Sequence, residues 1–160
     1  YTHAAEFGQG DAAMPAPAPV ASASGVGGVE LRPLTRAIDM RGSLAAAEFG
    51  RELPFVPQRC FLVYAVPSAE VRGEHAHRQC AQFLVCVHGQ VTAMVDDGRR
   101  RAEYRLDRPD VGLYIPPMVW GTQYRYSADA VLLVLASHAY DAADYIRDYA
   151  EFLALAGAAP

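Results

Sequence analysis

Short apolar runs separated by Gly, Pro and Asp constrain the fold of this chain more than any other feature. From Val29 onward these runs are rich in Val, Leu, Phe and Tyr. This alternation of apolar runs and turn residues is typical of an all-β protein. Many short antiparallel strands favour a jelly-roll β-barrel over an α/β fold. We predict strands at the following ranges: Arg59–Ala65, Gln82–Val87, Gln90–Val95, Ala102–Leu106, Gly112–Ile115, Gly121–Tyr126 and Val131–Ala136.

The two ends of the chain have a different character. Residues 1–28 consist mainly of Ala, Gly, Ser and Pro, so they predict a flexible tail, and residues 29–160 are expected to form one domain. Residues 141–155 place five large side chains on one helical stripe, which predicts a C-terminal α-helix packed on the barrel. The stripe consists of Tyr145, Ile146, Tyr149, Phe152 and Leu153.

Composition excludes several classes of function. The formal net charge is −4, so no broad basic surface is available for a nucleic-acid partner. No apolar run is long enough to span a membrane. Cys60, Cys80 and Cys86 are odd in number and lie in apolar stretches, which indicates reduced thiols and a cytoplasmic protein. All 14 basic residues are arginine, so Schiff-base chemistry through a lysine is excluded.

A His-x-His motif carries the strongest chemical signal. His75 and His77 lie two residues apart, so on a strand both rings point to the same face. The spacing from this motif to Gln82 and on to Gly89 resembles the first cupin motif, and residues 112–121 resemble the second. Gln82 and Gly121 stand where cupins carry a glutamate and a histidine ligand, so we predict that the site holds no metal.

A more specific resemblance runs along most of the chain. Blocks in the same order are similar to the TDP-4-keto-6-deoxyglucose 3,4-ketoisomerases, the WxcM-like family, over residues 36–153. The resemblance implies a jelly-roll homodimer with exchanged strands that acts in deoxysugar biosynthesis. The blocks include Arg41-Gly42-Ser43-Leu44, Arg72-Gly73, His75-Ala76-His77, Val119-Trp120 and Asp144-Tyr145-Ile146-Arg147-Asp148-Tyr149.

The chemistry of that reaction suits histidine. A C4 ketone acidifies the hydrogen on C3, so a base can remove it, form an enediol and return a proton at C4 without any cofactor. Histidine has an unperturbed pKa of about 6.5 and serves as base and then as acid. By the family's pattern, His77 is the principal base and His75 its partner.

The substrate's diphosphate calls for arginine, which can bind phosphate through two parallel hydrogen bonds. Arg72 is the first candidate because it lies close to His75, and Arg41 and Arg59 follow. Gln82 is predicted to bind a sugar hydroxyl, and Trp120 to form a wall of the sugar pocket.

Three other functions fit parts of the pattern. A 3,5-epimerase shares the fold and the substrate class, but it would be expected to carry a His–Asp pair and a tyrosine acid, which the sequence does not place. A non-catalytic sugar-nucleotide-binding cupin would bind without exchanging substrate hydrogen with solvent. A metal-dependent dioxygenase would need the ligands that Gln82 and Gly121 replace.

Overall fold

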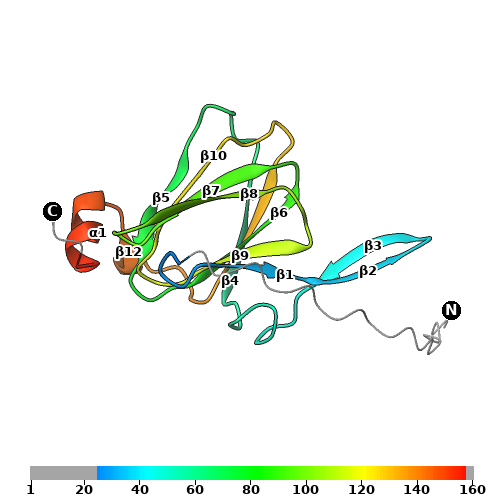
Figure 1. Ribbon diagram of the computed structural model, residues 1–160, viewed down its shortest axis with the longest axis horizontal. Helices are drawn as coiled ribbons and strands as arrows, with labels where there is room; N and C mark the ends of the chain where they lie inside the picture. The colour runs from blue at the N-terminus through cyan, green and yellow to red at the C-terminus, as the bar shows by residue number, and fades with distance from the viewer. Residues whose placement is uncertain (1–24, 158–160) are drawn as a thin grey trace.

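Two five-stranded sheets make up most of the computed structural model, which describes residues 25–157 (Figure 1). The first sheet has the order β1-β9-β6-β11-β4, and all its pairs are antiparallel. The second has the order β12-β5-β10-β7-β8, also antiparallel. The first sheet comprises β1 (Glu30–Pro33), β9 (Val111–Ile115), β6 (Gln82–His88), β11 (Val131–Ala136) and β4 (Arg59–Tyr64). The second comprises β12 (Tyr145–Ile146), β5 (Arg72–His77), β10 (Trp120–Tyr124), β7 (Val91–Asp96) and β8 (Arg101–Leu106).

This architecture confirms the predicted all-β jelly roll with a C-terminal helix. All seven predicted strands are present, each within two residues of its predicted ends, and β11 coincides with its prediction. The two sheets are not joined by strand pairing into a closed barrel. β1, β2, β3 and β5 were not among the predicted ranges; charged residues interrupt the apolar pattern of β1, β2 and β5, and β3 contains only one large apolar side chain.

A separate hairpin extends from the body of the molecule. It consists of β2 (Thr35–Asp39) and β3 (Gly42–Ala46), which pair only with each other among the described strands. Figure 1 shows it, in cyan, reaching away from both sheets. Most of its residues are exposed, including the large apolar side chains of Ile38 and Leu44.

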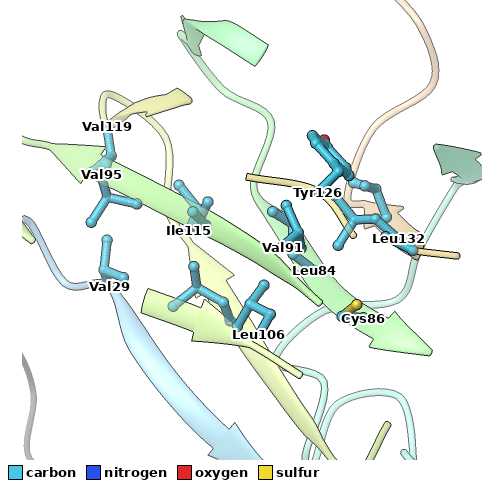
Figure 2. Close-up of a cluster of buried hydrophobic side chains, with 14 of the residues drawn as sticks. Val29, Leu84, Cys86, Val91, Val95, Leu106, Ile115, Val119, Tyr126 and Leu132 are labelled. Carbon is cyan, nitrogen blue, oxygen red and sulfur yellow. The ribbon is translucent and has the colours of Figure 1, made fainter. Parts of the chain in front are cut away.

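Apolar side chains from both sheets form the main core (Figure 2). Leu84 on β6 and Leu132 on β11 meet Val91 and Val95 on β7, and all four are almost fully buried. Val26 belongs to this core, so packed structure begins before residue 29, where the sequence predicted the start of the domain. The rest of that predicted tail, residues 1–24, lies outside the described residues.

The C-terminal helix is shorter than predicted. Residues 141–155 form a 3₁₀ turn, η1 (Ala142–Asp144), then β12, and only then the helix α1 (Tyr149–Leu155). Asp141 and Asp148 each accept a backbone N–H two or three residues ahead, so each caps its own turn. Pairing with β5 holds Tyr145 and Ile146 extended, which overrides their helical periodicity.

A second, smaller core fixes α1 to the second sheet. It contains Ala76, Trp120, Ile146 and Phe152, all buried. No helix among residues 25–157 is long and apolar enough to cross a membrane.

Candidate active site

A bulge in β5 sets the orientation of the first histidine. His75 lies opposite Gly121 on β10, and Gly73 lies opposite the next residue, Thr122, so Glu74 is the extra residue. Glu74 has φ of 50° and Gly73 has φ of 86°. The positive φ of Gly73 favours glycine, and a Cβ there would stand only 3.0 Å from the carbonyl oxygen of Gly121. Such bulges bend a strand and re-aim its side chains.

His75 is held in one tautomer. Its Nδ1 lies 2.8 Å from the carbonyl oxygen of Gly73, so Nδ1 carries the hydrogen and donates it. Nε2 is therefore left with its lone pair. Burial lowers the pKa of His75, and the Arg147 and Arg59 charges lower it further, against the hydrogen bond to Gly73. The ring is neutral at neutral pH and can act as a base.

His77 forms a dyad with a carboxylate. Its Nδ1 donates to Oδ2 of Asp144 at 2.9 Å, and the same carboxylate accepts the backbone N–H groups of Gln79 and Cys80. Burial, followed by the neighbouring His75, lowers the pKa of His77 to about 4, while Asp144 opposes that shift. The Nε2 atom of His77 is buried and has no hydrogen-bond partner in the described part of the chain.

Tyr145 packs against both imidazoles. Its ring centroid lies 4.9 Å from that of His75 and 4.4 Å from that of His77, and the two imidazoles are 4.9 Å apart. Both terminal nitrogens of Arg59 lie 3.4 Å from the Tyr145 hydroxyl. The guanidinium of Arg147 lies 4.3 Å above the same ring.

A cavity of about 240 Å³ opens beside this cluster. Its polar lining comes from both sheets, and apolar residues such as Phe61 and Leu84 complete the wall. A smaller recess shares part of this lining and reaches His77 and Cys80. The polar residues of the cavity are Arg72, His75, Gln82, Gln123, Tyr145 and Arg147.

The arginines around the cavity differ from most of the others in having no carboxylate partner. Among the described residues, nine arginines form an ion pair with a carboxylate, whereas Arg72, Arg147 and Arg59 do not; Arg99 and Arg100, which also form none, lie at a turn away from the cavity lining. Unpaired guanidinium groups at a cavity favour an anionic ligand.

The structure brings together most, but not all, of the predicted site residues. His75, Gln82 and Arg72 line the cavity, and His77 lines the recess. Arg59 stands behind Tyr145, with its guanidinium 5.5 Å from the rings of Phe61 and Tyr140.

Two predicted site residues lie away from the cavity. Arg41 is at the turn of the β2–β3 hairpin, where it pairs with Asp39 at 2.6 Å and its side chain is 89% exposed. Trp120 packs on Tyr149 and Phe152 beneath α1 and does not wall the cavity. Neighbouring residues on a strand face opposite sides, so Gly121 faces the recess while Trp120 faces the helix.

The sequence also missed two residues of this cluster. The structure contains a His–Asp pair, His77 with Asp144, and a tyrosine beside it, Tyr145. Asp144 and Tyr145 belong to the Asp144–Tyr149 block that resembles the ketoisomerases, and the prediction of a helix there hid their position beside His77. The absence of such a pair is therefore no argument against an epimerase.

One group of residues in the described chain could hold a metal ion. Ligand atoms of His77, Cys80 and Asp144 lie within 4.8 Å of one another. Both oxygens of Asp144 already accept hydrogen bonds, and the Cys80 thiol donates to the carbonyl oxygen of Ala81. Apart from Nε2 of His77, the polar atoms of the group are hydrogen-bonded within the protein, so the group fits a hydrogen-bonded support better than a metal centre.

A jelly roll with two imidazoles of one strand at an internal, arginine-rich cavity defines a cupin-type protein equipped for acid–base chemistry on an anionic ligand. The family model described as WxcM-like, C-terminal, matches residues 27–157. A TDP-4-oxo-6-deoxy-α-D-glucose 3,4-oxoisomerase from Aneurinibacillus thermoaerophilus is 44% identical over 115 residues, 72% of this chain and 83% of that protein. This chain belongs to the WxcM-like family of sugar 3,4-ketoisomerases and is an isomerase.

Solved structures agree with that assignment. A 3,4-ketoisomerase from Helicobacter canadensis is 36% identical with a TM-score of 0.78, covering 81% of this chain and 97% of that one. QdtA, a sugar 3,4-ketoisomerase from Thermoanaerobacterium thermosaccharolyticum solved with TDP, is 34% identical with a TM-score of 0.78, covering 81% and 94%. An epimerase from Streptomyces spheroides is 23% identical with a TM-score of 0.65 and shares only the fold.

Proposed function

We propose that this protein moves the keto group of TDP-4-keto-6-deoxyglucose from C4 to C3. The observation that carries the proposal is the pair of neutral imidazoles beside a cavity with unpaired arginines, in a chain of this family. A histidine-to-asparagine variant of QdtA was solved in complex with TDP-4-keto-6-deoxyglucose, which supports the same substrate here.

His75 is open to the cavity and His77 is not, which supports reversing the two roles predicted from the sequence: His75 becomes the base and His77 its partner. His75 lines the large cavity and has a free Nε2, whereas Nε2 of His77 is sealed from solvent. We therefore assign the proton transfer at carbon to His75. His77, oriented by Asp144, lies behind it and holds β12 and the His75 ring in place.

The proposed reaction needs no metal or cofactor. Nε2 of His75 removes the C3 hydrogen, which the C4 ketone acidifies, and the electron pair forms the C3–C4 double bond of an enediolate. The hydroxyl proton of O3 passes to O4, the imidazolium returns a proton to C4, and the ketone forms at C3. A base with a lowered pKa suits this sequence because it is free at neutral pH and becomes a strong acid once protonated.

Arg72 and Arg147 are the proposed anchors of the diphosphate. Both line the cavity, and neither is neutralised by a carboxylate among the described residues. Replacing either with alanine should raise the dissociation constant for TDP about tenfold, equivalent to about 1.4 kcal/mol. Arg105, which pairs with Asp107 on the surface, provides the matched control and should leave TDP affinity unchanged.

We also propose that two copies associate through the hairpin. Ile38 and Leu44 on the hairpin, and Leu62 and Tyr64 on the edge strand β4, are between 54% and 67% exposed. An uncovered edge strand and a projecting apolar hairpin are surfaces that a second copy would cover, as in a strand-exchanged homodimer. Leu44→Asp should shift the mass measured by light scattering to that of a monomer; an unchanged mass would refute this interface.

We place the reaction in the cytoplasm, because the three cysteines are all free thiols.

Variants of the two histidines test the proposed function. The purified protein, treated with a chelator, is incubated with TDP-4-keto-6-deoxyglucose, and the product is identified by NMR. The wild-type protein should yield a 3-keto sugar, and His75→Asn should lower kcat at least 1,000-fold while TDP still binds. His77→Asn should retain more activity than His75→Asn; the reverse order would return the base to His77. Loss of wild-type turnover on chelation, restored by a divalent cation, would refute metal-free chemistry.

A further inference from the structure

A buried carboxylate outside the cavity is held by three hydrogen bonds. Asp96, the last residue of β7, is 1% exposed. Its Oδ2 accepts from Nε of Arg101 at 2.6 Å and from the hydroxyl of Tyr149 at 2.7 Å. Its Oδ1 accepts the backbone N–H of Gly98 at 2.7 Å. Burial raises the pKa of Asp96, but these hydrogen bonds outweigh it and hold that pKa below its usual value, so the carboxylate is charged.

Asp96, Arg101 and Tyr149 form a closed group of side chains, here called the Asp96 cluster. A terminal nitrogen of Arg101 donates to the Tyr149 hydroxyl at 2.7 Å, so each of the three side chains is bonded to the other two. The Tyr149 ring also packs on Trp120, with centroids 5.2 Å apart. Hydrogen bonds to charged groups are stronger than neutral ones, so the cluster fixes Tyr149, the first residue of α1, to the ends of β7 and β8.

The place of Tyr149 in the chain connects this cluster to the cavity. Ile146, the last residue of β12, is fully buried and pairs with Ala76 on β5. Only Arg147 and Asp148 lie between Ile146 and Tyr149. Consecutive Cα atoms are about 3.8 Å apart, so a segment this short cannot shift far while both of its ends are held. The backbone of Arg147 is therefore held from both sides.

The side chain of Arg147 depends on that backbone for its position. It lines the cavity, and its guanidinium lies 4.3 Å from the centroid of the Tyr145 ring. Within residues 25–157, no hydrogen bond or ion pair fixes this guanidinium. A ring contact alone lets a long side chain slide, because such a contact has little directional preference compared with a hydrogen bond.

We propose that Tyr149 is a positioning residue that holds Arg147 at the cavity through the two-residue connection between β12 and α1. This inference rests on the proposed role of Arg147 as an anchor of the diphosphate. Tyr149 does not line the cavity itself. Without the cluster, the start of α1 can move away from β7, and Arg147 moves with it. The loss falls on binding rather than on chemistry, because the histidines lie on β5, which β10 holds independently of Tyr149.

Tyr149→Phe tests this role, because it removes the hydroxyl and keeps the ring against Trp120. Asp96 retains two N–H donors, so the variant should fold. The dissociation constant for TDP, measured by isothermal titration calorimetry, should rise about fivefold, less than the tenfold expected for loss of the Arg147 guanidinium itself. The KM for the keto sugar should rise in parallel, while kcat stays within about twofold of the wild-type value.

Tyr104→Phe is the matched control. The Tyr104 hydroxyl is buried and has no hydrogen-bond partner in the described part of the chain, so its loss should leave TDP affinity unchanged. Arg101→Met is a second test of the cluster, because it removes the donors to Asp96 and Tyr149 from a side chain that is 62% exposed. It should raise the dissociation constant for TDP at least about twofold.

A double-mutant cycle separates positioning from a general loss of structure. In an Arg147→Ala background, Tyr149→Phe should leave the dissociation constant for TDP unchanged, because the arginine that it positions is absent. An equal rise in both backgrounds would overturn the inference, and so would an unchanged dissociation constant in Tyr149→Phe or Arg101→Met. The proposed function fails separately, if the wild-type protein yields no 3-keto sugar, whereas this inference is decided by TDP affinity alone.

Discussion

Acidification should destabilise the folded protein through His77. In the unfolded chain this imidazole has a pKa near 6.5, whereas burial and the neighbouring His75 lower its pKa to about 4 in the fold. Between these values the unfolded state binds more protons than the folded state. The free energy of unfolding therefore falls as the pH drops from about 6.5 to about 4, and the contribution is constant above that range.

The size of the effect follows from the shift. A displacement of about 2.5 pKa units corresponds to about 3 kcal/mol at 1.36 kcal/mol per unit. Burial is the largest cause of the shift, and water that reaches the imidazolium would relieve part of it. Asp144, in hydrogen-bond contact, would also stabilise the charged ring. We therefore expect a loss of about 2 kcal/mol between pH 7.5 and pH 4.5.

Urea unfolding of the wild-type protein and of His77→Asn isolates this contribution. The single tryptophan, Trp120, is buried beneath α1 and reports unfolding by fluorescence. Protein concentration is held fixed, since association would add to the measured stability. The difference between the two proteins should shrink by about 2 kcal/mol on acidification. A difference that does not change with pH would refute the neutral, buried state of His77.

Three other substitutions test the support of the site. Asp144→Asn should cost about 2 kcal/mol in urea unfolding and at least tenfold in kcat, because three N–H donors share this carboxylate; full activity would show that the dyad is dispensable. Phe152→Ala should cost about 3 to 5 kcal/mol, because the ring is fully buried between α1 and β12, and a loss below 1 kcal/mol would contradict that packing. Gly112→Ala should cost about 1 to 3 kcal/mol, because its Cβ would overlap the Phe83 ring, whereas Gly121→Ala has at least 3.7 Å of clearance and should leave stability unchanged.

The sequence predicted the sheets well because their strands carry strong apolar runs. β11, in which Leu and Val occupy every position but the last, was predicted at its observed ends. The His-x-His spacing placed both imidazoles on one strand for the same local reason. These features depend on residues that are close together in the sequence, so the sequence pattern alone is enough to predict them.

Features that depend on distant partners were harder to predict. Tyr145 and Ile146 fit a helical stripe, and only their pairing with β5 makes them a strand. The dyad of His77 with Asp144 joins residues 67 positions apart, and no local pattern reveals it. Trp120 and Gly121 both belong to the motif that resembles the second cupin motif, but strand alternation sends only one of them toward the site.

The most direct test of the account is the reaction in deuterium oxide, followed by NMR of the sugar. With TDP-4-keto-6-deoxyglucose, the wild-type protein should give a product whose ketone is at C3 and whose C4 carries solvent deuterium, and His75→Asn should give neither. A product that keeps its ketone at C4 with an inverted neighbouring carbon, or deuterium uptake that persists in His75→Asn, would contradict imidazole-mediated keto migration at this site.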